Sequence, residues 1–157
     1  MNQYTLDRWV VIQGLPDESI NSISQTPEGY LWIGTRKGLF RSNGIAFKQC
    51  NPLNDTNRIN LYIYTLYTDS RGILWIGSSY GLIKYQNGQY EQFTKKDGLS
   101  SNFITRITED SYGNLWLGTS GDYLIYFCNG QFKLFDESHG LDGKSISSIF
   151  ESVNGTL

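Results

Sequence analysis

The sequence has few of the residues that metal, redox and nucleic-acid sites require. Its 157 residues include one His and two Cys, and the formal net charge is −2 without any cluster of Lys and Arg. His139 stands alone, and Cys50 and Cys128 lie far apart with no CxxC pair, which argues against a zinc site. The missing basic patch argues against nucleic-acid binding. We therefore predict no metal and no cofactor.

Long apolar runs and an export signal are also missing. No apolar run approaches the length of about 18 residues that a membrane-spanning helix needs. The opening MNQYTLDRWVV lacks the charged start, apolar centre and small-residue cleavage site of a signal peptide. From these residues alone we expect no direct membrane insertion, and a cytoplasmic location if the chain is expressed as written.

Aromatic residues and glycine, in contrast, are abundant. Aromatic residues make up 15% of the chain and there are 17 Gly, whereas there are only three Pro and a single Ala, Ala46. Strands accept aromatic side chains well, and glycine permits tight turns. The composition therefore favours strands joined by short turns over helices.

An internal repeat organises the chain. Trp32, Trp75 and Trp116 are 43 and 41 residues apart, and each is preceded by Leu and followed two residues later by Gly. Apolar residues also recur twelve and nine positions before each Trp. The structural repeat residues are Trp32, Trp75, Trp116, Gly34, Gly77 and Gly118. A repeat of this length indicates a solenoid, an array or a propeller.

Each repeat is predicted to contain four short strands. Its first segment alternates apolar and polar residues, as half-buried strands do, at Ile20–Gln25, Tyr62–Thr68 and Phe103–Glu109. A turn follows, with the sequence TPEG, DSRG or DSYG, and an Asn-Gly pair before the last strand favours a hairpin. Four antiparallel strands per repeat are typical of a β-propeller blade, in which the Trp packs between neighbouring sheets.

We therefore predict an all-β fold, an incomplete β-propeller of about three four-stranded antiparallel blades plus a lone strand at each end. The expected blades are residues 20–50, 62–93 and 103–135, with the start of a fourth at 146–157. The lone strands are Asp7–Ile12 and Ile146–Glu151. Because the last residues match the repeat up to the position before its Trp, we expect the chain to be a truncated piece of a larger propeller.

Two segments, GYLWIGTRKGLFRSNG and DGLSSNFITRITEDSYGNLWLGTS, resemble the two-component regulator propeller family, and the resemblance covers essentially all 157 residues. It implies a seven-bladed sensor propeller, usually periplasmic. In the family, a membrane helix and an output module follow: a histidine kinase, a diguanylate cyclase or a hybrid regulator in a phosphorelay. It also implies sensing of extracellular ligands, often carbohydrate fragments. Two departures are an extra residue in SGDYLIYF and a first inter-blade link, NPLNDTNRIN, that lacks the Gly-Leu pair of the other links.

Candidate ligand-binding residues lie in the loops, since loops on a rigid scaffold carry most binding chemistry. In propellers, ligands usually meet the links between blades and the loops between second and third strands. The candidates there are Asp17, Glu18, Arg36, Lys37, Arg58, Lys95, Asp97, Asn102, Asp122 and Tyr123. Such polar side chains suit a sugar, but any solvated loop contains residues of the same kinds.

Three functions remain open at this point. The first is a non-catalytic ligand-sensing segment of a bacterial signal-transduction sensor, with a small molecule such as a carbohydrate fragment as its partner. The second is a protein-interaction or self-assembling fragment without a ligand, in which open blade edges pair copies end to end. The third, a propeller lyase or hydrolase, lacks support because no convergent set of catalytic residues stands out. We predict that the chain is not an enzyme.

Overall fold

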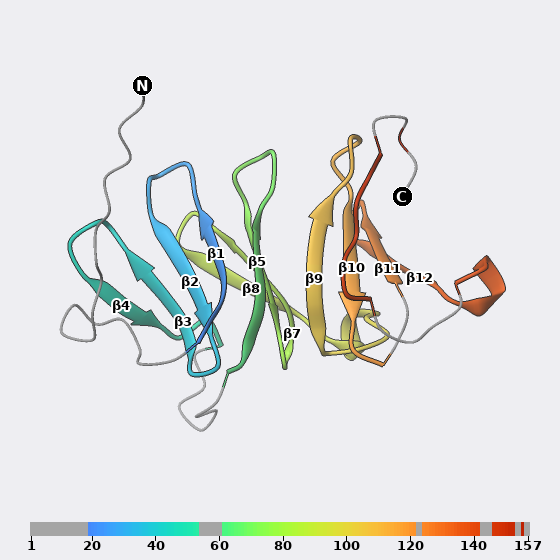
Figure 1. Ribbon diagram of the computed structural model, residues 1–157, viewed down its shortest axis with the longest axis horizontal. Coiled ribbons are helices and arrows are strands. Elements are labelled where there is room, and N and C mark those ends of the chain that lie inside the picture. Colours follow the sequence, from blue (N-terminus) through green and yellow to red (C-terminus); the bar gives the residue numbers. More distant parts are fainter. Residues whose placement is uncertain (1–18, 54–60, 122–123, 142–145, 153–154, 156–157) are drawn as a thin grey trace.

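The computed structural model describes residues 19–53, 61–121, 124–141, 146–152 and 155. Its strands form three antiparallel four-stranded sheets, each ordered as in the sequence (Figure 1). The first sheet comprises β1 (Ile20–Gln25), β2 (Leu31–Thr35), β3 (Gly38–Ser42) and β4 (Phe47–Cys50). The second comprises β5 (Ile63–Thr68), β6 (Leu74–Ser78), β7 (Gly81–Gln86) and β8 (Gln89–Phe93). The third comprises β9 (Ile104–Glu109), β10 (Leu115–Thr119), β11 (Leu124–Cys128) and β12 (Gln131–Phe135).

The sheets stand next to one another through their first strands. β1 lies beside β5, and β5 lies beside β9 (Figure 1). The helical elements in the described ranges are two 3₁₀ turns, η2 (Lys95–Asp97) and η3 (Glu137–His139). The described part of the chain contains no helix long and apolar enough to cross a membrane. The prediction of an all-β, incomplete propeller is therefore confirmed.

The two predicted lone strands have different outcomes. Asp7–Ile12 lies outside the described residues. Ile146–Glu151 is described and lies beside β9, where Arg106 Nε donates a hydrogen bond to the carbonyl oxygen of Ser147 at 2.7 Å. It forms no ladder with any described strand, so the expected strand is absent there. A strand requires a hydrogen-bonded neighbour, which apolar periodicity alone does not supply.

Aspartate side chains shape the turns between first and second strands in the second and third sheets. In the second sheet, Asp69 Oδ1 accepts hydrogen bonds from the backbone N–H groups of Arg71 and Ile73, at 3.0 and 2.8 Å. Asp69 Oδ2 accepts another from Trp75 Nε1 at 2.9 Å. An aspartate that bonds to backbone two residues ahead stabilises a turn locally. The same carboxylate therefore fixes both the turn and the orientation of the repeated Trp.

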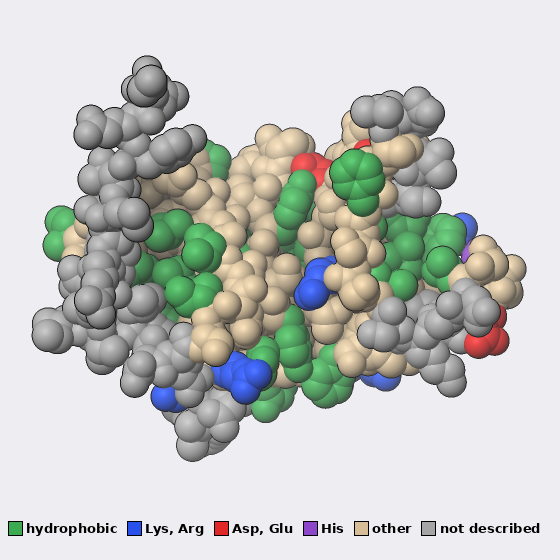
Figure 2. All heavy atoms as spheres, viewed as in Figure 1, with side chains coloured by type: hydrophobic (Ala, Val, Ile, Leu, Met, Phe, Trp, Pro, Cys, Tyr) green, Lys and Arg blue, Asp and Glu red, His purple; other side chains and the backbone are tan. Residues whose placement is uncertain are grey.

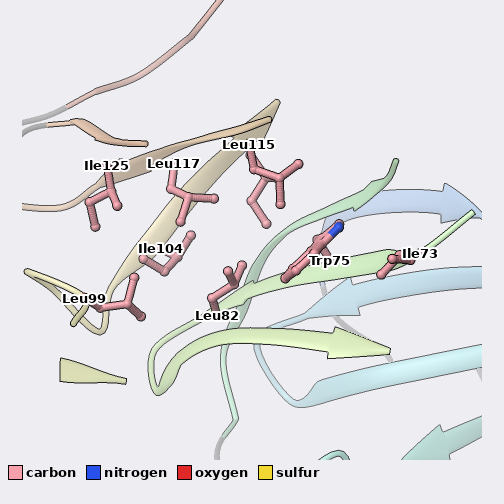
Figure 3. Close-up of a cluster of buried hydrophobic side chains, with 9 residues drawn as sticks. Ile73, Trp75, Leu82, Leu99, Ile104, Leu115, Leu117 and Ile125 are labelled. Carbon is pink, nitrogen blue, oxygen red and sulfur yellow. The ribbon is translucent and has the colours of Figure 1, made fainter. Parts of the chain in front are cut away.

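Apolar clusters fill the spaces between neighbouring sheets. The cluster between the first and second sheets includes Trp32 and Leu39, packed against Leu66 and Ile76. Figure 3 shows the second cluster, in which Trp75 and Leu82 of the second sheet lie near residues of the third. Those residues of the third sheet are Ile104, Ile107, Leu115, Leu117 and Ile125. Removing these surfaces from water is the main favourable contribution to folding.

The repeated glycine of each second strand makes room for the next first strand. A Cβ added to Gly34 would lie 2.5 Å from Ile63 Cγ2, and one added to Gly77 would lie 2.6 Å from the backbone oxygen of Ile104. A Cβ added to Gly118 would lie 3.1 Å from the Cβ of Ile146. Residues 146–152 therefore occupy, beside the third sheet, the place that β5 and β9 occupy beside the first and second.

Candidate ligand-binding site

The link that follows β8 is folded by its own side chains. Thr94 begins η2, and its N–H and Oγ1 both donate to Asp97 Oδ2, at 2.8 and 2.9 Å. Thr94 Oγ1 in turn accepts from the N–H of Lys96 at 3.2 Å. Gly98 ends the turn with a φ of 104°, a conformation that a side chain disfavours. This reciprocal capping holds Lys95, Lys96 and Asp97 in a fixed relation.

The same link is fastened to the turn between β6 and β7. Asn102 Oδ1 accepts a hydrogen bond from the N–H of Lys95 at 3.0 Å. The backbone oxygen of Asn102 accepts another from the N–H of Gly81 at 2.8 Å. Gln92 Nε2 donates to the backbone oxygen of Tyr80 at 2.7 Å. Residues from three separate segments therefore meet at one end of the second sheet.

A pocket of about 460 Å³ lies where these segments meet. Its lining comprises Tyr80, Gln92, Thr94, Lys95, Lys96, Asp97 and Asn102. The groups are two ammonium groups, one carboxylate, two amides, a hydroxyl and a phenol, which together provide hydrogen-bond donors and acceptors of both charges. Such a lining suits a small polar molecule. Within the described ranges, no cluster of three or more His, Cys, Asp or Glu side chains could hold a metal ion.

An aromatic pair lies beside the loops at the ends of the first two sheets. The rings of Tyr62 and Tyr64 are stacked, with centroids 4.4 Å apart. Arg36 Nε donates to Tyr62 Oη at 3.0 Å, and the Arg36 guanidinium lies 5.7 Å from the centre of that ring. The backbone oxygen of Tyr62 accepts from the N–H of Ser79 at 3.0 Å, next to Tyr80. Tyr62 thereby connects the β2–β3 loop to the β6–β7 loop.

Half of the predicted binding residues lie in the described ranges. Lys95, Asp97 and Asn102 share the pocket, whereas Arg36 and Lys37 lie in the neighbouring β2–β3 loop and do not line it. The remaining five lie outside the described residues: Asp17, Glu18, Arg58, Asp122 and Tyr123. A binding role for any of the ten remains a prediction.

Several residues of this region were not among those predicted from the sequence. Tyr80 follows Trp75 by five positions, as Lys37 follows Trp32, so the repeat register could have identified it. Lys96 lies between two residues that were selected. Tyr62 could not be identified in this way, because its hydrogen bond with Arg36 joins residues 26 positions apart. Tyr64 lies two positions from Tyr62, so the stacking of the two rings is local.

The comparisons with known proteins agree with this architecture. A family profile described as two component regulator propeller matches residues 14–37, 57–80 and 98–121. No curated protein matches the chain.

Solved structures that match the chain include the extracellular domains of two B. thetaiotaomicron hybrid two component systems, BT3049 and BT4673. Their sequence identities are 26% and 25%, with TM-scores of 0.74 and 0.69, over 87% and 90% of this chain. The matched parts are 19% and 20% of those domains, so this chain spans about a fifth of their length. A virginiamycin B lyase from Staphylococcus aureus matches with a TM-score of 0.59 at 15% identity, over 77% of this chain and 42% of the lyase. At that identity the likeness shows the fold alone.

Proposed function

Because its three repeats belong to the two component regulator propeller family, we propose that this chain is a ligand-sensing segment of a bacterial signal-transduction sensor. The observation that carries the proposal is the polar pocket at the end of the second sheet, formed by the β6–β7 turn and the link after β8. Its two lysines and its aspartate lie on a capped 3₁₀ turn, so their backbone positions are set before a ligand arrives. A site that is fixed in advance costs less ordering entropy on binding.

The repeats are those of regulators and not of enzymes. The solved domains that match at 25–26% identity are extracellular domains of regulatory systems. This agrees with the prediction that the chain is non-catalytic. The lyase likeness lends no support to an enzymatic function, since it rests on 15% identity.

The ligand that fits this end of the molecule is a small carbohydrate fragment, and an acidic one fits better than a neutral one. Lys95 and Lys96 line the pocket with a single carboxylate, that of Asp97. Hydroxyl groups of a sugar can pair with the amides of Gln92 and Asn102, and a carboxylate or sulfate group can pair with the ammonium groups. The periplasm and a phosphorelay are the proposed setting, supported by the extracellular location of the related domains.

Thermal unfolding in the presence of a sugar panel tests this function. The panel should pair neutral disaccharides with uronic-acid and sulfated disaccharides of the same size. We expect an acidic member to raise Tm, since a ligand that binds only the folded state stabilises it. Replacing both lysines (Lys95→Ala with Lys96→Ala) should abolish the shift.

Lys48→Ala is the matched control, because Lys48 is an exposed lysine in β4 that does not line the pocket. It should leave the Tm shift unchanged. A panel in which no sugar changes Tm, or a double variant that responds like the unmodified chain, would contradict the proposed function.

A further inference from the structure

Aromatic side chains gather where two neighbouring first strands begin. Tyr62 directly precedes β5, Tyr64 lies in β5, and Phe103 directly precedes β9. β5 lies between β1 and β9, and β9 lies between β5 and residues 146–152. Figure 2 shows hydrophobic side chains at the surface near the lower edge of the view, where β5 and β9 begin, with Lys and Arg side chains on either side. We call Tyr62, Tyr64 and Phe103 the aromatic row.

Two members of the aromatic row occupy equivalent places in their repeats. Tyr62 and Phe103 each stand thirteen positions before the repeated Trp. The backbone oxygen of Tyr62 accepts a hydrogen bond from the N–H of Ser79 at 3.0 Å, and that of Phe103 accepts one from the N–H of Ser120 at 3.2 Å. The same backbone bond therefore holds both residues against the loop that follows their second strand. Two neighbouring repeats present an aromatic side chain at the same end of the molecule.

The rings of the row are partly accessible to solvent. Phe103 is 48% exposed. Tyr62 and Tyr64 are half-buried, and their rings are stacked with an angle of 25° between the planes. The face of an aromatic ring carries negative charge and attracts C–H groups with a partial positive charge. A sugar ring presents such C–H groups on its flat side and hydroxyl groups at its edge, so it suits an aromatic surface next to polar side chains.

An arginine stands at one end of the aromatic row. Arg36 occupies, in the first repeat, the position that Ser79 and Ser120 occupy in the other two. Its exposed side chain reaches Tyr62, to which Nε donates at 3.0 Å. A guanidinium carries five N–H donors in a planar fork that matches a carboxylate or sulfate group. The hydrogen bond to Tyr62 orients this fork, so the row ends in a group suited to an anion.

The aromatic row adjoins the polar pocket at two points. Asn102 lines the pocket and directly precedes Phe103. Tyr80 also lines the pocket and directly follows Ser79, whose N–H bonds to Tyr62. Consecutive Cα atoms are about 3.8 Å apart, so each contact with the row is one short step from the pocket lining. A ligand too long for the pocket can extend onto the row.

The grouping of these side chains distinguishes the row from ordinary surface. Single exposed aromatic residues are common on soluble proteins and need no functional explanation. Here three aromatic rings lie next to an arginine at one end and a pocket with two lysines at the other. The charges at both ends have the same sign, so a ligand with repeated acidic groups complements the whole surface.

We propose that the aromatic row is a second carbohydrate subsite, continuous with the polar pocket, and that the ligand is an acidic oligosaccharide longer than a disaccharide. One acidic sugar lies in the polar pocket against Lys95 and Lys96. The following sugar rings lie on the aromatic row, and an acidic group further along pairs with Arg36. The subsite rests on the proposed function, because it requires a carbohydrate in the polar pocket.

Isothermal titration calorimetry with sugars of two lengths tests the subsite. One probe pair is digalacturonate and tetragalacturonate, in which every ring carries a carboxylate. The second pair is the disaccharide and the tetrasaccharide of chondroitin sulfate. In a series that binds, we expect the Kd of the tetrasaccharide to be at least about tenfold lower than that of the disaccharide, because only the longer sugar contacts the row.

Substitutions in the row should affect the longer sugar alone. Phe103→Ala and Tyr64→Ala should each raise the tetrasaccharide Kd about three- to tenfold, the range that aromatic contacts commonly contribute. Arg36→Gln should raise it too and should weaken its dependence on salt, because an ionic contact is screened by salt. All three variants should keep the disaccharide Kd of the unmodified chain, which also shows that the fold and the polar pocket are intact.

Tyr112→Ala is the matched control, since Tyr112 is an 85% exposed tyrosine in the β9–β10 turn, at the other end of the third sheet. It should leave both Kd values unchanged. Equal Kd values for the two lengths, or row variants that weaken the disaccharide as much as the tetrasaccharide, would overturn the subsite while the proposed function stands. Failure of both lengths to bind in both series would overturn the proposed function and the subsite with it.

Discussion

Both faces of the third sheet carry apolar side chains, yet they differ in what covers them. One face packs Leu115, Leu117 and Ile125 against the second sheet, and all three are buried. The other face holds Trp116, which is half-buried beside a pocket. Trp75, at the equivalent place in the second sheet, is only 2% exposed.

This difference shows that the repeat alone does not decide whether its Trp is core or binding surface. Trp75 and Trp116 have the same local environment, since each donates its Nε1–H to an aspartate of the preceding turn at 2.9 Å. What differs is the ring from the next sheet, which covers Trp75 and has no counterpart over Trp116 among the described residues. The neighbour determines the role of the residue.

The largest expected effect is the difference in stability lost when each of the two tryptophans is replaced. Trp75→Ala should lower the free energy of unfolding by about 3–5 kcal/mol, because it leaves a cavity between two packed sheets. Trp116→Ala should cost roughly half as much, since part of its ring already faces solvent. Urea unfolding of both variants measures the difference. Equal costs would mean that Trp116 is as well packed as Trp75.

A smaller difference in stability is expected between alanine substitutions at two of the repeated glycines. Gly77→Ala would place its Cβ 2.6 Å from the backbone oxygen of Ile104, so the neighbouring strand must move; the expected cost is about 1–3 kcal/mol. Gly118→Ala would meet side-chain atoms of Ile146 and Arg106 at 3.1 Å and should cost less than about 1 kcal/mol, because residues 146–152 can shift outside any ladder. Chemical denaturation at matched conditions compares them, and a larger cost at Gly118 would contradict the account.

The smallest effect concerns acid stability near Trp116. Burial by itself would raise the pKa of Asp110, but hydrogen bonds from Asn114, Trp116 and Tyr112 outweigh it and hold the pKa below its ordinary value. Ionised Asp110 therefore stabilises the fold above the unfolded-state pKa of about 4, and this contribution is lost as pH falls through the lower folded-state pKa.

Asp110→Asn tests this dependence while keeping an oxygen acceptor for Trp116. Unfolding free energies measured between about pH 2 and pH 7 should show the variant less stable near neutrality, with the difference shrinking as pH falls through the folded-state pKa of Asp110. A difference that stays constant over this range would show that the charge of Asp110 contributes nothing.

Much of the fold could be predicted because the repeat reports on strand spacing. The offsets between Trp32, Trp75 and Trp116 and their glycines indicated three sheets, and Asn-Gly pairs such as Asn87-Gly88 indicated the hairpins. The strand expected at Ile146–Glu151 did not form, since its apolar pattern carries no information about a pairing partner. Periodicity predicts which residues can form a strand, and the ladder depends on what lies beside it.

The candidate site was only partly accessible to the same reasoning. Lys95, Asp97 and Asn102 were selected as loop residues, and the structure places them around one pocket. The contact between Arg36 and Tyr62 joins residues 26 positions apart in different sheets. No spacing in the sequence indicates such a contact, because it depends on how two sheets meet.

A ¹H–¹⁵N NMR titration of the chain with an acidic disaccharide is the sharpest test of the proposed ligand site, since it locates binding residue by residue. Backbone signals of Tyr80, Gln92, Lys95, Lys96 and Asn102 should shift in a saturable manner, while those of Trp116 and Phe135 in the third sheet should not. Shifts confined to Trp116 and Phe135, or no saturable shift at the polar pocket with any acidic disaccharide of the panel, would contradict ligand binding at the polar pocket.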